Sequence, residues 1–299
     1  MSADLVLGTA QLGSAYGINN SVGELTEGQA FDVLDAAFGA GVRLVDSAEG
    51  YGKSERIIGD YMRTKGNDFG VCTKLPGSFD DAGVDVRRRI HNRIQDSCSR
   101  LSTSHLEIYY LHSFDTCKKA AVLDALVDER SIGTVRYVGV SVYEPSELRY
   151  MLDNLLGVID AVQIPFNVFN CARWIEGGLL EEAASKGVII LARSIYLQGV
   201  VFMSADDQRA ISLSLSEALA KYAQISSSSG VSPAELACSF VCQTPGIDYA
   251  IMGSETPEQV LANASMVNSP ISNKAARRAI IAMSESLDQK CLDPREWRL

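Results

Sequence analysis

Short apolar runs alternate with longer segments of helical period from one end of the chain to the other. The runs are rich in Val, Ile, Leu and Tyr, and they lack the strict apolar–polar alternation of a strand with one wet face. Such runs are typical of parallel strands that helices cover. We therefore expect eight buried strands, at residues 5–10, 43–47, 70–74, 107–112, 137–141, 161–166, 188–194 and 249–254.

The segments between these runs have the period and the caps of α-helices. One of them, Thr26–Gly41, begins at a threonine suited to an N-cap and ends at a glycine. Pro233 stands early in a later helix, where its missing N–H removes no hydrogen bond. Repeated strand–helix units without a break in composition predict one (β/α)8 TIM barrel, a single domain over residues 1–299. A doubly wound sheet is the alternative, but no strand here runs into G-x-G-x-x-G.

The widest interval between predicted strands runs from Ser194 to Tyr249. In a barrel, a connection that follows a strand lies on the catalytic side, so this one could cover a ligand. Within it, we expect the polar segment Ser226–Gly230 to be a solvated turn before a helix that begins at Ser232.

Composition narrows the function classes. The chain carries a net charge of −10 and its pI is near 4.9, which argues against a nucleic-acid partner. No run approaches about 18 consecutive apolar residues, so we expect no membrane span. The seven cysteines include no C-x-x-C pair, which favours buried thiols in a reducing compartment and no metal site. With no signal-peptide pattern at the start, we expect a cytoplasmic protein, and a monomer by default.

Polar residues stand where the predicted strands end, and in a barrel those ends form the active-site face. Asp46 ends the second strand, Lys74 the third and His112 the fourth, while Tyr51 follows in a loop between two glycines. Any one of them alone would be an ordinary cap, surface or core residue. The four together indicate a site.

These residue types suit the protonation of a carbonyl oxygen. A free tyrosine has a pKa of about 10, and a neighbouring ammonium favours its phenolate form, which makes the tyrosine a usable acid and base. Asp46 can hold the charge and position of Lys74, and His112 can orient a carbonyl. No side chain supplies hydride, so this chemistry needs a nicotinamide or a flavin.

Over nearly its whole length the chain resembles the aldo-keto reductases. "VDSAEGYG", "CTKLPG" and "LSTSHLEIYYLHSFD" resemble the family's segments that carry its catalytic residues. The resemblance implies a catalytic tetrad of Asp46, Tyr51, Lys74 and His112, with Tyr51 as the acid, and a NAD(P)H-dependent reduction of a small-molecule aldehyde or ketone.

The resemblance also implies positions for the cofactor. Gly8, Thr9 and Ala10 occupy the place that runs under the nicotinamide end. Ser141 and Gln163 match residues that hold the carboxamide, although the family's neighbouring Asn is Val142 here. The position that stacks on the nicotinamide ring, commonly aromatic, is Arg193, whose guanidinium plane can stack on a flat ring.

"IMGSETPEQVLAN" resembles the family's loop for the adenosine phosphates. The resemblance places Gly253, Ser254, Gln259 and Asn263 there. A basic residue suited to the 2′-phosphate of NADPH is replaced by Glu255. A carboxylate disfavours a phosphate dianion but can accept from a ribose hydroxyl, so the cofactor is NADP(H) or NAD(H) without a strict preference for NADPH.

Substrate contacts are expected from Tyr16 and Asn19, in a glycine-rich segment near the start, and from Trp174 as a wall of the pocket. The early segment resembles relatives associated with bacterial sugar modification, which points towards a sugar or sugar-nucleotide carbonyl. Two other readings remain open. One is a nucleotide-binding regulatory barrel subunit, and the other is a Schiff-base aldolase that uses Lys74.

Overall fold

Eight parallel strands close into a barrel in the computed structural model, each paired with the next in chain order and the eighth with the first. The structure describes residues 2–20, 22–77, 79, 85–204, 206–207, 211, 213–288 and 292. The predicted fold class is therefore confirmed, and closure excludes the open doubly wound sheet. The strands are β1 (Asp4–Gly8), β2 (Leu44–Asp46), β3 (Gly70–Leu75), β4 (Leu106–Leu111), β5 (Val135–Ser141), β6 (Ala161–Pro165), β7 (Ile189–Arg193) and β8 (Tyr249–Gly253).

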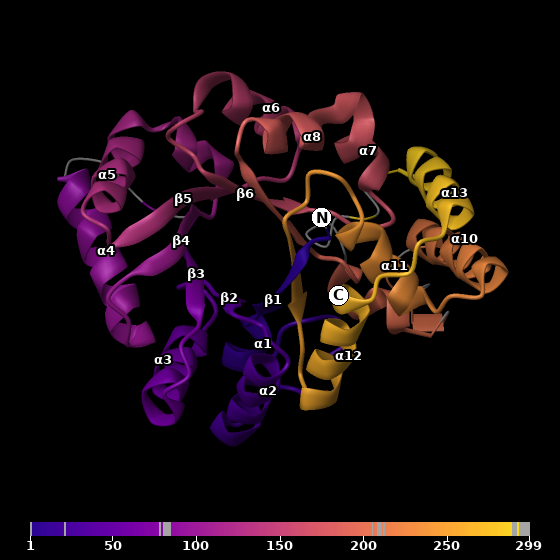
Figure 1. Cartoon of the computed structure of the whole chain (residues 1–299), viewed down its shortest axis with the longest axis horizontal. Coiled ribbons are helices and arrows are strands. Elements are labelled where there is room, and N and C mark those ends of the chain that lie inside the picture. The colour runs from indigo at the N-terminus through magenta and orange to yellow at the C-terminus, as the bar shows by residue number, and fades with distance from the viewer. Residues whose placement is uncertain are drawn as a thin grey trace.

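Helices surround the barrel on the outside (Figure 1). They are α1 (Ala10–Gly13), α2 (Glu27–Gly39), α3 (Ser54–Lys65), α4 (Val86–Leu101), α5 (Ala120–Ser131), α6 (Pro145–Asn154), α7 (Cys171–Ile175), α8 (Leu179–Ser185), α10 (Leu213–Ser229), α11 (Pro233–Cys242), α12 (Pro257–Asn268) and α13 (Lys274–Glu285). Among the described residues the order also includes the 3-10 segments η1 (Phe114–Lys118), η2 (Glu176–Gly178) and η3 (Leu197–Phe202).

Side-chain caps fix where several helices begin. Thr26 and Gln29 form the capping box of α2, and Ser232 and Glu235 form that of α11, so the N-caps read from the sequence are confirmed. The serine segment was predicted wrongly. Ser226–Ser229 are the last turn of α10, not a solvated turn, because serine hydroxyls there bond to nearby backbone carbonyls and hold the helix end.

Two layers of apolar side chains form the core. One fills the barrel and comprises Val6, Cys72, Ile108, Tyr110, Ala161, Leu191 and Ile251. The larger layer lies between the strands and the surrounding helices. All six described cysteines are buried and free of disulfides, as predicted. Within the described residues, no helix is long and apolar enough to cross a bilayer, and no cluster of three metal-ligating side chains occurs.

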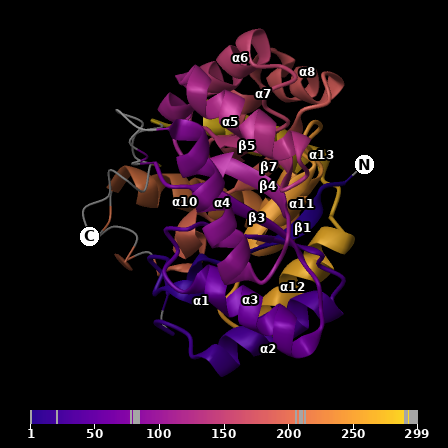
Figure 2. The same ribbon diagram turned by 90° about the vertical axis from the view of Figure 1, so that its left-hand side faces the viewer.

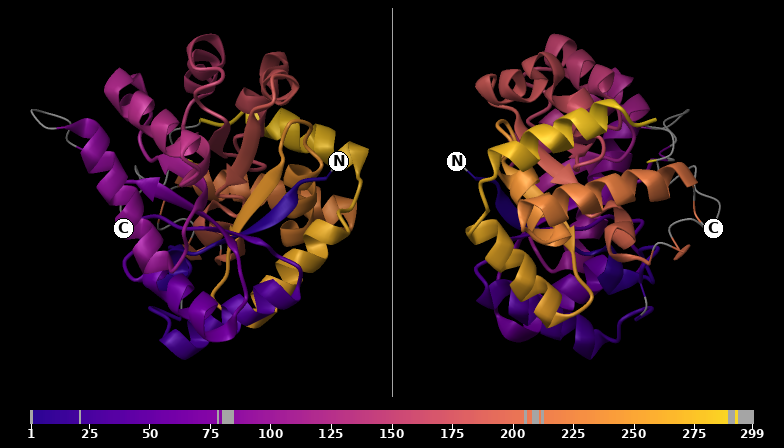
Figure 3. Two further views of the ribbon diagram at one scale, coloured as in Figure 1. Left: turned by 60° about the vertical axis from the view of Figure 1, so that its left-hand side comes forward. Right: turned by 90° about the vertical axis from the view of Figure 1, so that its right-hand side faces the viewer.

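The two ends of the barrel differ. The chain's first residues lie at one end and α10 extends towards the other (Figure 2). The long connection after β7 begins with η3 on the carboxyl-terminal side of the strands and continues as α10, which packs beside α13 on the outside (Figure 3). The segment expected to cover a ligand is thus divided into a short piece near the strand ends and a helix that supports the barrel.

Candidate active site

A cavity of about 750 Å³ opens at the carboxyl-terminal ends of the strands. This volume falls within the range of small-molecule sites. Residues from β1, β2, β6, β7 and β8 line it, together with the segments that follow β1, β2, β4, β5, β7 and β8 and with α12. The face is the one predicted from the strand-end residues.

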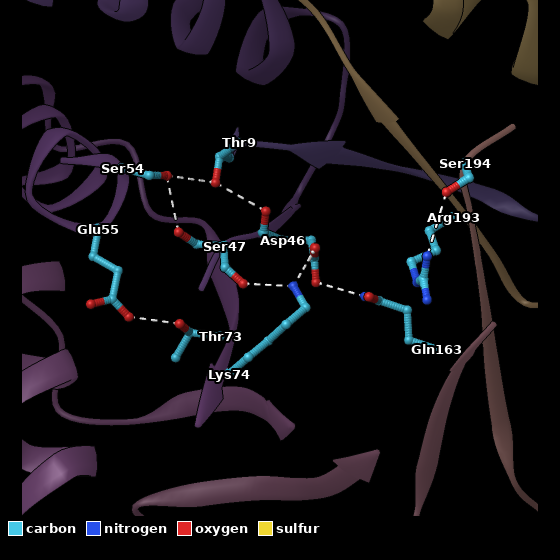
Figure 4. A network of polar contacts seen from close by, with 10 residues as sticks. All are labelled: Thr9, Asp46, Ser47, Ser54, Glu55, Thr73, Lys74, Gln163, Arg193 and Ser194. Atoms are coloured by element: carbon cyan, nitrogen blue, oxygen red, sulfur yellow. Dashed lines mark hydrogen bonds and ion pairs between the residues drawn. The ribbon is translucent and has the colours of Figure 1, made fainter. Parts of the chain in front are cut away.

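A buried ion pair lies beside this cavity, between Asp46 of β2 and Lys74 of β3 (Figure 4). Lys74 Nζ donates to Asp46 Oδ2 at 2.6 Å and to the Ser47 carbonyl at 2.7 Å. Burial acts to lower the pKa of Lys74, but the charges of Asp46 and Tyr51 outweigh it, and the pKa lies above its ordinary value. Lys74 is therefore an ammonium at neutral pH.

Gln163 of β6 reaches across the barrel to the other oxygen of Asp46, and its Nε2 donates to Asp46 Oδ1 at 2.9 Å. A carboxylate only accepts hydrogen bonds, so the amide nitrogen must face Asp46 and the amide oxygen must point elsewhere. That oxygen has no hydrogen-bond partner among the described residues. It is an acceptor on a residue that lines the cavity.

The loop that carries Tyr51 is held in place by close contact between its backbone and that of α1. A Cβ on Gly13 would lie 2.0 Å from the Tyr51 carbonyl oxygen, and a Cβ on Gly52 would lie 2.3 Å from the Gly13 carbonyl oxygen. Gly52 also has a positive φ of 56°, which glycine adopts at no steric cost. With α1 packed this closely, the Tyr51 ring comes to 5.0 Å from Lys74 Nζ.

A network of hydroxyl groups also holds both ends of the loop that carries Tyr51. Thr9 Oγ1 donates to the Asp46 carbonyl at 2.9 Å, Ser54 Oγ donates to Thr9 Oγ1 at 2.7 Å, and the hydroxyls of Ser47 and Ser54 are 3.0 Å apart (Figure 4). All are buried. Thr9, predicted as a cofactor contact, lines the cavity, but its hydroxyl group is hydrogen-bonded to Asp46 and Ser54.

His112 lies just beyond β4 and lines the same cavity. Burial lowers the pKa of its imidazole to about 4, and the positive charges of Lys74 and Arg193 add to this effect. At neutral pH the ring is therefore uncharged, with one N–H to donate and one nitrogen to accept. Its side chain has no hydrogen-bond partner within the described part of the chain.

At the opposite side of the cavity, the loop after β8 and α12 present polar groups. Gln259 Oε1 accepts from the Glu255 backbone N–H at 2.7 Å, and the Gln259 side chain also interacts with the Glu255 carboxyl. Asn263 bonds to Ser254 and Tyr196. Gln163 on one side and Gln259 and Asn263 on the other are thus the polar side chains of this cavity that could hold the two ends of a nicotinamide dinucleotide.

Most of the predicted site residues line one cavity: Gly8, Thr9, Ala10, Tyr16, Asn19, Asp46, Tyr51, His112, Gln163, Arg193, Gly253, Glu255, Gln259 and Asn263. Lys74, Ser141 and Ser254 are buried behind its surface. Trp174 is not a wall of this cavity. It is fully buried on α7, where its ring packs in the outer core, so the expected substrate contact is corrected.

Sequence reasoning missed Tyr143 and Gln198. Tyr143 follows β5, and the guanidinium of Arg193 lies 4.5 Å over its ring. Gln198 in η3 donates to Tyr16 Oη at 3.4 Å, which joins the loops after β1 and β7 beside the cavity. Tyr143 could have been found as an aromatic residue that closely follows a strand end. Gln198 could not, because its partner Tyr16 is 182 residues away in the sequence.

Comparison with known proteins gives the same picture. A family model described as the aldo/keto reductase family matches residues 4–279. The Protein tas of Escherichia coli is 26% identical over 321 residues, covering 87% of this chain and 90% of that protein. An NADP(+) aryl-alcohol dehydrogenase of Phanerodontia chrysosporium is 29% identical over 137 residues, 40% of this chain and 36% of its own.

Solved structures show the same fold. The aldo-keto reductase AKR11C1 of Bacillus halodurans in its holo form has a TM-score of 0.72 at 17% identity, over 98% of this chain and 96% of that chain. The glycerol dehydrogenase AKR11B4 of Gluconobacter oxydans has a TM-score of 0.71 at 22% identity, over 93% and 90% of the two chains.

Proposed function

Because the chain belongs to the aldo/keto reductase family and is an NAD(P)H-dependent oxidoreductase acting on small-molecule carbonyl compounds, we propose that it reduces the aldehyde or ketone group of a sugar or sugar nucleotide, with Tyr51 as the acid. The observation that carries the proposal is the Asp46–Lys74 pair beside Tyr51 and His112 at one cavity. The polar residues Asn19, Asn20 and Gln198 on its rim suit a hydroxylated substrate.

The cofactor would lie between Gln163 and α12. Gln163 would accept from the carboxamide, Ser141 would support that end from behind, and Gln259 and Asn263 would receive the adenosine phosphates. Gly8, Thr9, Ala10, Gly253 and Ser254 would form the floor between the two ends. The bound nicotinamide supplies hydride to the carbonyl carbon, which no side chain can do.

Proton transfer falls to the residues at the other side of the cavity. Neutral His112 donates an N–H to the substrate carbonyl and orients it, and Tyr51 gives its phenolic proton to the oxygen as the alkoxide develops. The Lys74 ammonium stabilises the phenolate that remains, because an opposite charge nearby favours the charged form. Asp46 keeps that ammonium charged and in place, and Gln163 holds Asp46.

Lys74 is poorly suited to the alternative Schiff-base chemistry. A nucleophilic amine must be neutral and must reach the substrate, but Lys74 Nζ is protonated, 1% exposed as a side chain and bonded to two oxygens. A regulatory barrel would bind nucleotide without turnover, so turnover separates it from an enzyme.

Glu255 bears on the choice of nucleotide. It lines the cavity next to Gln259, and burial raises the pKa of its carboxyl. An ionised carboxylate there opposes a 2′-phosphate, whereas either protonation state can bond to a ribose hydroxyl. We infer that Glu255 removes a strict preference for NADPH. The ratio of the two Kd values should therefore favour NADPH less here than in a relative with a basic residue at this place.

The test of this function is the Tyr51→Phe variant with NADPH and NADH side by side. We expect fluorescence titration to give nearly the wild-type Kd for either nucleotide, while kcat for an aldose panel falls by about 10²–10⁴-fold, the contribution of a general acid. Unchanged turnover would reject Tyr51 as the acid. Failure of the wild type to bind either nucleotide would reject the hydride mechanism.

A further inference from the structure

Arg193 holds a cation in the cavity without a counter-ion. It closes β7 and lines the cavity, and no carboxylate among the described residues pairs with it. Its guanidinium has two polar contacts, to Ser194 Oγ and to the Val142 carbonyl, both at 3.5 Å. These are longer than the about 2.7–3.2 Å of ordinary N–H···O bonds, so most of its five donors are unused.

The other charged groups of the cavity do not neutralise it. Lys74 and Asp46 neutralise each other at 2.6 Å. Glu255 lines the cavity from the loop after β8 but forms no ion pair among the described residues. A half-buried cation without a partner is costly, and proteins that keep one in a site usually present it to an anion.

The cation is also held in position and close to the reacting groups. Tyr143 covers one face of the guanidinium at 4.5 Å, and Figure 4 shows Arg193 on the same side of the network as Gln163. Its charge helps to lower the pKa of His112, after burial and the charge of Lys74. The N–H groups of Arg193, whose two contacts are both 3.5 Å long, therefore belong to a side chain that lines the cavity and is packed against Tyr143.

We propose that the edge of Arg193 binds an anionic group, a carboxylate or a phosphate, on the carbonyl substrate, so that the preferred substrates are acidic, such as sugar acids or sugar phosphates. This inference rests on the proposed function. A guanidinium fork matches the geometry of both groups and forms charge-assisted bonds to them. The bound anion also offsets the repulsion between the guanidinium and the oxidised, positively charged nicotinamide.

The experiment compares carbonyl compounds that differ by one anionic group. Succinic semialdehyde and butanal form the carboxylate pair, and D-glyceraldehyde 3-phosphate and D-glyceraldehyde form the phosphate pair. For each pair the ratio of kcat/KM, charged over neutral, is measured in the wild type, Arg193→Gln, Arg193→Lys and the surface control Arg63→Gln. Effects on the hydride step cancel in this ratio.

We expect a wild-type ratio of about 10–100 for at least one pair, as for a charge-assisted hydrogen-bond pair. The ratio should fall to near unity in Arg193→Gln, take an intermediate value in Arg193→Lys and stay at the wild-type value in Arg63→Gln. The pair that shows the effect identifies carboxylate or phosphate.

Two results would overturn the inference. One is a wild-type ratio near unity for both pairs. The other is a ratio that Arg193→Gln leaves unchanged; if the Kd for both nucleotides also rises in that variant, the cation belongs to the cofactor phosphates. If the wild type reduces none of the four compounds, nor any neutral aldose, the proposed function itself fails.

Discussion

Two ion pairs, each with a buried carboxylate, stand on opposite faces of the same strand. Asp46 pairs with Lys74, and Glu55 pairs with Arg100, both at 2.6 Å. Neighbouring residues of β3 serve the two pairs: Lys74 points inward to Asp46, and Thr73 points outward and donates to Glu55 at 2.6 Å (Figure 4). Alternate residues of a strand face opposite sides, so one strand supports both.

The two ion pairs have the same length and differ in their surroundings. The side chains of Lys74 and Asp46 are 1% and 6% exposed beside a cavity. The outer pair joins α3 to α4, with Glu55 4% exposed and Arg100 37% exposed to solvent. All four carboxylate oxygens have a partner. The inner pair therefore lies beside the cavity and the Tyr51 ring, where the proposed mechanism needs a positive charge, whereas the outer pair joins two helices.

Neutralising the inner pair should give the largest effect. In the double variant Asp46→Asn and Lys74→Met no buried charge is left unpaired, so we expect stability to change little. On the proposed mechanism, the phenolate that forms when Tyr51 gives up its proton then lacks a stabilising ammonium, and kcat should fall by about 10²–10⁴-fold. Steady-state kinetics and chemical denaturation measure the two quantities. A stable double variant with wild-type kcat would show that the inner pair, like the outer one, has no role in turnover.

Breaking the outer pair should act on stability alone. Arg100→Met leaves Glu55 with only Thr73, and we expect the free energy of unfolding to fall by about 2 kcal/mol, less than for a fully buried pair because Arg100 is half-exposed. The matched control is Arg63→Met, which removes a surface pair to Asp60 on α3 and should lose less than about 0.5 kcal/mol. Loss of kcat in folded Arg100→Met protein would show that the outer pair also serves the site.

A third test is a pH dependence next to the inner pair. The pKa of His112 is lowered from 6.5 to about 4. Between these values the unfolded chain binds a proton that the folded protein does not, so stability should rise with pH across this window and be fully present above it. Substrate orientation by neutral His112 should likewise persist to about pH 4.

A ring-proton titration by NMR measures this directly, because the chain has three histidines and His112→Gln assigns the signal. A titration midpoint near 6.5 would contradict the burial of His112. It would also predict a break in the kcat/KM profile at that pH.

Local pattern predicted the strand-end residues of the site but could not predict contacts made by folding. Asp46, Lys74 and His112 follow apolar runs, and closure of the barrel brings such ends to one face. The contact between Gln198 and Tyr16 depends on how two distant loops meet. Trp174 lies on a helix of five residues, which is too short for its sequence to reveal the buried face. From the sequence, the flat guanidinium of Arg193 suggests stacking on a ring, whereas only the structure shows that no carboxylate among the described residues pairs with it.

The close approach of Gly13 and Gly52 has a consequence for mutational scanning. Each would be intolerant of every other residue, since even one Cβ collides with backbone at 2.0–2.3 Å. Neither need touch substrate or cofactor through a side chain. A tolerance map of this protein would therefore rank two glycines among its catalytic positions, and only measurement of nucleotide binding and folding in each variant would separate scaffold from chemistry.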